Sequence, residues 1–150
     1  MLEQIALGTL LLVITIMIHA FAMRMAFRVT GWAHAERWNL RRAWTGTILT
    51  AGFVLMMFFA AVLEATVWAG TYVVSGAFDH LEPAFYFSMV TYTTLGFGDI
   101  VLDSSWRILS VIEAANGIIM FGWTTALIFW VVQQLAAAGR GSDAGGGSGR

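Results

Sequence analysis

Long apolar runs limit the structures open to this chain more than any other feature. Residues 5–23 carry no formal charge, residues 43–74 are interrupted by one charge at Glu64, and residues 106–135 form a third apolar run that is uncharged from Ala114 to Gln134. A helix of about 20 apolar residues crosses the ~30 Å hydrocarbon layer of a bilayer. The pattern therefore predicts three membrane-spanning helices, the first over residues 3–25.

The composition supports the same conclusion. Hydrophobic residues make up 59% of the chain and charged residues 11%, and the mean hydropathy is +0.75, which is too apolar for an ordinary soluble domain. A secretory signal peptide at the N-terminus is disfavoured by the long apolar run and by Glu3. We expect an all-α membrane protein, with no nucleic-acid partner.

Catalysis is not expected. The chain has no cysteine, which excludes disulfides and thiolate sites, and no arrangement of nucleophile, base or metal ligands appears in the sequence. We expect neither an enzyme nor a bound cofactor.

A fourth apolar segment, residues 81–93, is too short to cross. As a helix it would span roughly 20 Å, so a re-entrant helix is predicted. Pro83 suits the first turn of such a helix, and Asp79 is a candidate N-cap.

Arginines predict the orientation. Five of them lie between Arg24 and Arg42, and short arginine-rich loops stay in the cytoplasm. Residues 26–42 are therefore predicted to be a cytoplasmic loop that contacts lipid head groups, with the N-terminus outside and the C-terminus inside the plasma or inner membrane.

Residues 136–150, rich in glycine and serine, are predicted to be a flexible tail, either natural or an added linker.

The most specific motif directly follows the short segment. Residues 91–99 read Thr-Tyr-Thr-Thr-Leu-Gly-Phe-Gly-Asp. A cation loses its water most easily to rings of backbone carbonyls that face one axis. Such a strand needs left-handed backbone angles, which Gly96 and Gly98 adopt without steric cost.

This stretch resembles the selectivity filter of the potassium channel family. The resemblance covers residues 43–135 and implies an outer helix (43–74), a pore helix (81–93), a filter (94–98) and an inner helix (106–135), with helix 3–25 as a peripheral addition. It also implies a homotetramer, because one filter strand cannot enclose an ion. The implied K⁺ ligands are the carbonyls of Thr94, Leu95, Gly96 and Phe97, with the Thr94 hydroxyl at the inner end and Gly98 completing the filter.

The resemblance also suggests roles around the filter. Asp99 would concentrate cations at the outer mouth, with Tyr86 as a candidate partner because Val90 replaces the glutamate that some members carry. The side chains of Leu95 and Phe97 are expected to pack against the pore helix.

Candidate gating residues lie on the inner helix. Gly117 falls where the family often has a hinge glycine, or it is a small residue that lets membrane helices approach closely. One helical face is expected to line the cavity, with Phe129 narrowing it. The alternative is that this face packs on the outer helix. The residues of this face are Ile118, Phe121, Thr125 and Phe129.

Three further residues are candidates for pH sensing. Glu64 and Glu113 lie within predicted spans, where a carboxylate must face protein or water. They could bias gating by protonation, or bond to a neighbouring helix. His34 could report internal pH, whereas His19 is expected to be an isolated polar side chain.

The sequence thus predicts a potassium-selective channel subunit that conducts K⁺ passively. The alternatives are a weakly selective cation channel and a non-conducting membrane subunit that assembles with another protein. Because no sensor domain fits after residue 135, gating is expected to depend on the membrane, pH, the filter or a regulatory partner.

Overall fold

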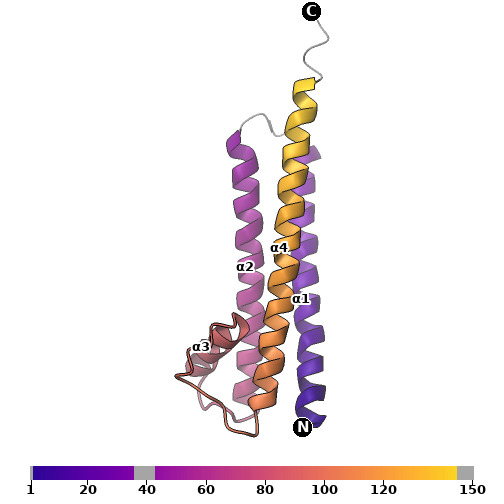
Figure 1. Ribbon diagram of the computed structural model, residues 1–150. Coiled ribbons are helices and arrows are strands. Elements are labelled where there is room, and N and C mark those ends of the chain that lie inside the picture. The colour runs from indigo at the N-terminus through magenta and orange to yellow at the C-terminus, as the bar shows by residue number, and fades with distance from the viewer. Residues whose placement is uncertain (1, 36–42, 145–150) are drawn as a thin grey trace, which may run out of the picture.

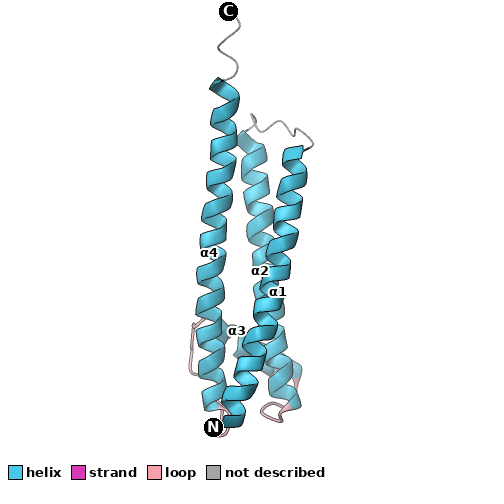
Figure 2. Cartoon of the chain, turned by 90° about the vertical axis from the view of Figure 1, so that its right-hand side faces the viewer, coloured by secondary structure: helices cyan, strands magenta, loops and turns pink. Residues whose placement is uncertain are grey.

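Three long helices and one short helix make up the protein. The computed structural model describes residues 2–35 and 43–144. Helices α1 (Leu2–Ala35), α2 (Ala43–Val74) and α4 (Arg107–Ala144) run side by side, and α3 (Leu81–Tyr92) lies across one end of this bundle (Figure 1). The start of α1 lies at the same end as α3 (Figure 2).

Each long helix contains a segment long and apolar enough to cross a membrane. These segments are Leu2–Arg28, Gly46–Val74 and Arg107–Gln134. The short helix α3 spans about 18 Å at 1.5 Å per residue, too little to cross. The three predicted spans and the short fourth helix are therefore present in an all-helical chain.

Two of the long helices extend beyond their expected ends. Helix α1 continues to Ala35, so the first part of the expected loop 26–42 is helical; residues 36–42 lie outside the described residues. Helix α4 continues to Ala144, so the expected flexible tail is helical up to that point. Arginine, alanine and methionine after residue 23, and the alanines at 136–138, favour continued helix.

Helix α3 begins at Leu81, one residue later than a cap at Asp79 would place its start. His80 occupies the N-cap position with extended backbone angles and makes no side-chain capping bond. The expectation that Asp79 caps this helix is therefore wrong. The inward face of α3 follows helical spacing and is buried through Ala84, Phe87, Ser88 and Tyr92.

The core forms where α3 meets the bundle. Trp68, Tyr72, Tyr92, Leu109 and Met120 are almost fully buried there. A smaller cluster at the other end joins α1, α2 and α4 through Ala26, Phe53, Met57 and Val131. Among the described residues α1 packs on α2 and α4 but not on α3, so it lies on the opposite side of the bundle.

Candidate functional site

The chain leaves α3 in a compact turn that is held by backbone hydrogen bonds. Thr93 caps the helix through its amide, which donates to Met89 at 3.1 Å. The amides of Leu95 and Gly96 both donate to the Val90 carbonyl, at 2.9 and 3.3 Å. The start of segment 94–98 is therefore anchored on the last turn of α3.

Left-handed residues alternate along this segment. Thr94, Gly96 and Gly98 have φ angles of 58°, 56° and 77°. In an ordinary strand successive residues point to opposite sides, and a left-handed residue at every second position turns the backbone so that successive carbonyls can face the same way. Such an arrangement suits a row of carbonyl ligands.

The left-handed Thr94 is a feature that sequence reasoning missed. A β-branched residue at positive φ is a genuine outlier, and strained residues of this kind cluster at functional sites. The motif offered a signal, because Thr94 precedes Gly96 at the same two-residue spacing that separates Gly96 from Gly98. Among residue types, however, only glycine predicts a positive φ, because it adopts this angle without steric cost.

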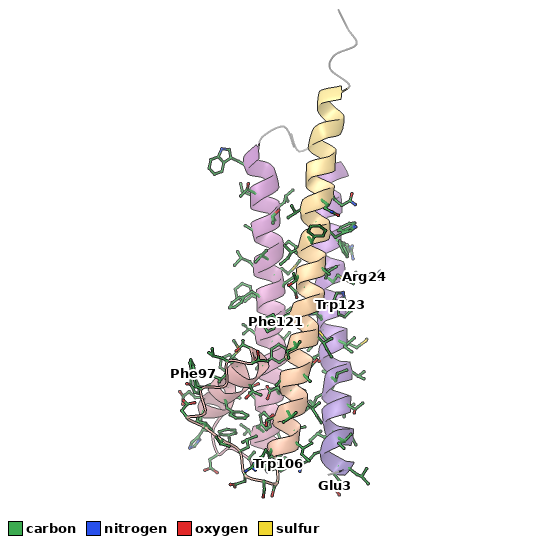
Figure 3. All side chains as sticks on the ribbon, in the orientation of Figure 1. Glu3, Arg24, Phe97, Trp106, Phe121 and Trp123 are labelled. Atoms are coloured by element: carbon green, nitrogen blue, oxygen red, sulfur yellow. The ribbon has the colours of Figure 1, made fainter. Side chains whose placement is uncertain are left out.

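The side chains of Leu95 and Phe97 do not pack on α3. Leu95 is 58% exposed and Phe97 64% exposed, and Phe97 points away from the bundle (Figure 3). The expectation that they pack against the pore helix is therefore not met within the single chain. The amides turn inward to the Val90 carbonyl, which leaves these side chains on the outer side of the segment.

Asp99 follows the segment and has a partner on α3. The Tyr86 hydroxyl donates to the Asp99 carboxylate at 2.8 Å, as the sequence predicted. This bond raises the pKa of Tyr86 above its ordinary value. Tyr86 therefore remains a hydrogen-bond donor at and well above neutral pH.

One face of α4 is uncovered in the single chain. Ile118 is 61% exposed and Phe129 64% exposed, and Phe121 and Thr125 on the same face are also exposed. The alternative interpretation, in which this face packs on α2, does not fit these exposures. The face remains free to line a space between copies of the chain.

Gly117 is buried and allows a close approach between α4 and α3. A Cβ atom at this position would lie 1.9 Å from the Tyr92 carbonyl oxygen. The structure therefore gives Gly117 a packing role beside α3, apart from the exposed face that the other candidate gating residues share.

Glu113 joins three helices in the core. It lies on α4, accepts a hydrogen bond from the Tyr72 hydroxyl of α2 at 2.8 Å, and accepts another from the Ser88 hydroxyl of α3. Ser88 also approaches the Ala65 carbonyl, at 2.7 Å. Buried carboxylates require such donors, and this one holds α3 against both neighbours.

Glu64 forms a second buried junction, which sequence reasoning missed in part. Its carboxylate lies 3.0 Å from His19 Nδ1 of α1 and accepts a hydrogen bond from the Tyr92 hydroxyl of α3. His19 is thus not an isolated side chain. Its partner is 45 residues away on another helix, a separation that no sequence spacing reveals.

One sequence candidate for pH sensing remains, His34. The side chain of His34 lies outside the described residues. No group of three or more His, Cys, Asp or Glu side chains that could hold a metal ion occurs in the described part of the chain.

Comparison with known families agrees with this architecture. The family described as "Ion channel" matches residues 9–134, which include most of all three spans and the whole of α3. This chain belongs to the ion channel family and is a multi-pass membrane protein. The match begins within α1 at residue 9, whereas the resemblance to the potassium channel family begins at residue 43.

Two other comparisons gave no relatives. No curated protein and no solved structure matches the chain.

Proposed function

We propose that this ion channel is selective for potassium and that residues 94–98 are its selectivity filter. The observation that carries the proposal is the alternation of left-handed residues at Thr94, Gly96 and Gly98 within a Thr-Leu-Gly-Phe-Gly sequence that follows a re-entrant helix. Carbonyls aligned in this way replace the hydration shell of a permeant cation.

Four copies of the chain would surround the pore. Each copy contributes one strand, and the carbonyls of Thr94, Leu95, Gly96 and Phe97 form successive rings around the K⁺ ion, which is the transported species. The exposed side chains of Leu95 and Phe97 support this assembly, because large apolar groups beside a filter need cover from a neighbour. The C-terminal end of α3, partially negative, faces the central cavity.

The remaining site residues have supporting roles in this scheme. The Asp99 carboxylates concentrate cations at the outer mouth. The face of Ile118, Phe121, Thr125 and Phe129 lines the cavity below the filter. The arginine-rich end of α1 lies in the cytoplasm, which places α3 and the start of α1 on the outer side.

The test is ion flux through purified protein in liposomes, with K⁺ or Na⁺ as the permeant cation. Gly96→Ala and Gly98→Ala are compared with Gly76→Ala. All three glycines have positive φ, of 56°, 77° and 76°, and a Cβ at any of them meets open space in the chain. The local backbone penalty is therefore matched at about 1–2 kcal/mol, and only the place in the chain differs.

We expect the wild type and Gly76→Ala to pass K⁺ and exclude Na⁺, and the two filter variants to lose K⁺ flux or selectivity. If Na⁺ passes as well as K⁺ through the wild type, the channel is weakly selective and the proposal fails. A wild type that passes neither ion across a range of pH and membrane tension supports a non-conducting subunit. If Gly76→Ala is as damaging as the filter variants, the assignment of residues 94–98 loses its support.

A further inference from the structure

Helix α1 reaches the candidate filter through a chain of buried polar contacts. His19 of α1 lies 3.0 Å from Glu64 of α2, and the other carboxylate oxygen of Glu64 accepts the hydroxyl of Tyr92 on α3. His19 and Glu64 are completely buried and Tyr92 almost so. Since α1 and α3 do not pack on each other within the described residues, Glu64 bridges them.

Tyr92 lies just before the candidate filter and is fixed in place by its contacts. It is the last residue of α3, two positions before Thr94. Its carbonyl lies against Gly117 of α4, and its ring meets that of Phe121 at 5.9 Å between centroids. With the hydroxyl held by Glu64, Tyr92 is fixed at both its backbone and its side chain.

The imidazole of His19 is itself held in a defined orientation. Its Nε2 lies 3.2 Å from the Thr124 hydroxyl oxygen of α4, and its ring lies 5.4 Å from the ring of Trp123, which faces α1 in Figure 3. These contacts aim Nδ1 at Glu64. With a proton on Nδ1, His19 donates to one oxygen of the Glu64 side chain while the Tyr92 hydroxyl donates to the other.

We propose that His19 is a positioning residue for ion selectivity. It orients the Glu64 carboxylate towards the Tyr92 hydroxyl, and Tyr92 in turn fixes the backbone that enters segment 94–98. Helix α1 is then a functional part of the pore and not only a peripheral addition. This inference rests on the proposed function of that segment as the filter.

The chain offers a closely matched set of variants. In His19→Asn the side-chain amide nitrogen takes the place of Nδ1 and still donates to Glu64, whereas in His19→Gln the amide reaches towards Thr124 instead. Thr15→Val removes the bond from Asn116 of α4 to α1, 2.8 Å long. Thr15 lies one turn from His19 and is equally buried, but its partner is not Glu64.

The first measurement is the K⁺ to Na⁺ permeability ratio, from reversal potentials in planar bilayers. We expect His19→Gln to lower the ratio about tenfold, the effect of losing one buried hydrogen bond. His19→Asn and Thr15→Val should remain within about twofold of the wild type. The inference is overturned if His19→Gln keeps the wild-type ratio, or if Thr15→Val lowers it as much.

Tyr92→Phe keeps the proposal testable if His19→Gln does not assemble. It removes the last link while leaving the contact between His19 and Glu64 intact, and it should lower the ratio to the same degree. Where both single variants assemble, the double variant should be no worse than either, because the two residues act through one path. Additive losses would overturn the inference.

A second measurement separates this inference from the proposed function. Hydrogen exchange at the Leu95 and Gly96 amides, which bond to the Val90 carbonyl, reports the order of the segment whether or not it selects ions. If the wild type proves unselective, the proposed filter fails, yet faster exchange in His19→Gln and not in His19→Asn still supports the positioning role. Equal exchange in both variants overturns it.

Discussion

The substitution Gly117→Ala tests the packing of α4 against the end of α3 most directly. The added Cβ would lie 1.9 Å from the Tyr92 carbonyl oxygen, and real Cβ contacts essentially never fall below 3.0 Å. The two helices must therefore separate by at least about 1.1 Å at this point. Both groups belong to helix backbones and cannot rotate away, so we expect a destabilisation of about 3 kcal/mol, the upper part of the range for overpacking.

The displacement matters for function because Tyr92 leads into segment 94–98. Binding sites need their geometry held within about 0.5 Å, so a shift of this size should abolish the proposed K⁺ selectivity of the assembled protein. A pure hinge role for Gly117 has another signature, namely a lower open probability with selectivity and stability unchanged.

The assay combines thermal unfolding of the purified assembly with K⁺ and Na⁺ flux in liposomes. Gly122→Ala is the control, since it lies on the same helix and its added Cβ meets open space in the chain. The control should be neutral or slightly stabilising, as alanine is the better helix former. If Gly117→Ala unfolds at the wild-type temperature and selects K⁺ normally, the packing argument is refuted.

Three further predictions concern the proposed filter and its supports. Thr94→Gly should give an assembly about 1 kcal/mol more stable than Thr94→Ala, because only glycine relieves the positive φ; equal thermal unfolding would count against strain at this position. The bond to Asp99 raises the pKa of Tyr86, so its stabilisation is complete below about pH 10 and is lost as the pH rises through the higher value; Tyr86→Phe should remove this alkaline decline in thermal stability, and a decline that persists in the variant would refute the assignment. Tyr72→Phe takes one of two donors from the buried Glu113 and should lower the unfolding free energy by about 2 kcal/mol, whereas an unchanged midpoint in thermal unfolding would show that this bond does not matter.

The long helices and the re-entrant segment could be predicted because they depend on the length of apolar runs. A bilayer sets that length, so residues 81–93 were recognisable as too short to cross. The helix ends at Ala35 and Ala144 were not predictable in the same way. They lie beyond the apolar runs, where bilayer thickness no longer sets how far a helix continues.

The supporting contacts of the candidate site were harder to predict. Glu64 and Glu113 stood out because carboxylates are costly within a span, yet their donors lie on other helices and follow no spacing along the chain. For the same reason, no pattern in the sequence pairs His19 with Glu64. The outward side chains of Leu95 and Phe97 depend on the backbone angles at Thr94. A positive φ is not expected of threonine, so these angles could not be predicted from the residue type.

The contacts of α1 have a consequence for how the protein is made. Helix α1 is synthesised before α2 and α4, so Thr15 and His19 enter the bilayer before their partners exist. Glu64 follows His19 by 45 residues, and Asn116 follows Thr15 by 101. Polar side chains within a bilayer are costly until they are paired. The contacts of α1 are therefore complete only after α4 has inserted. A chain truncated before α4 would therefore leave the Thr15 hydroxyl without Asn116 and the His19 Nε2 without Thr124.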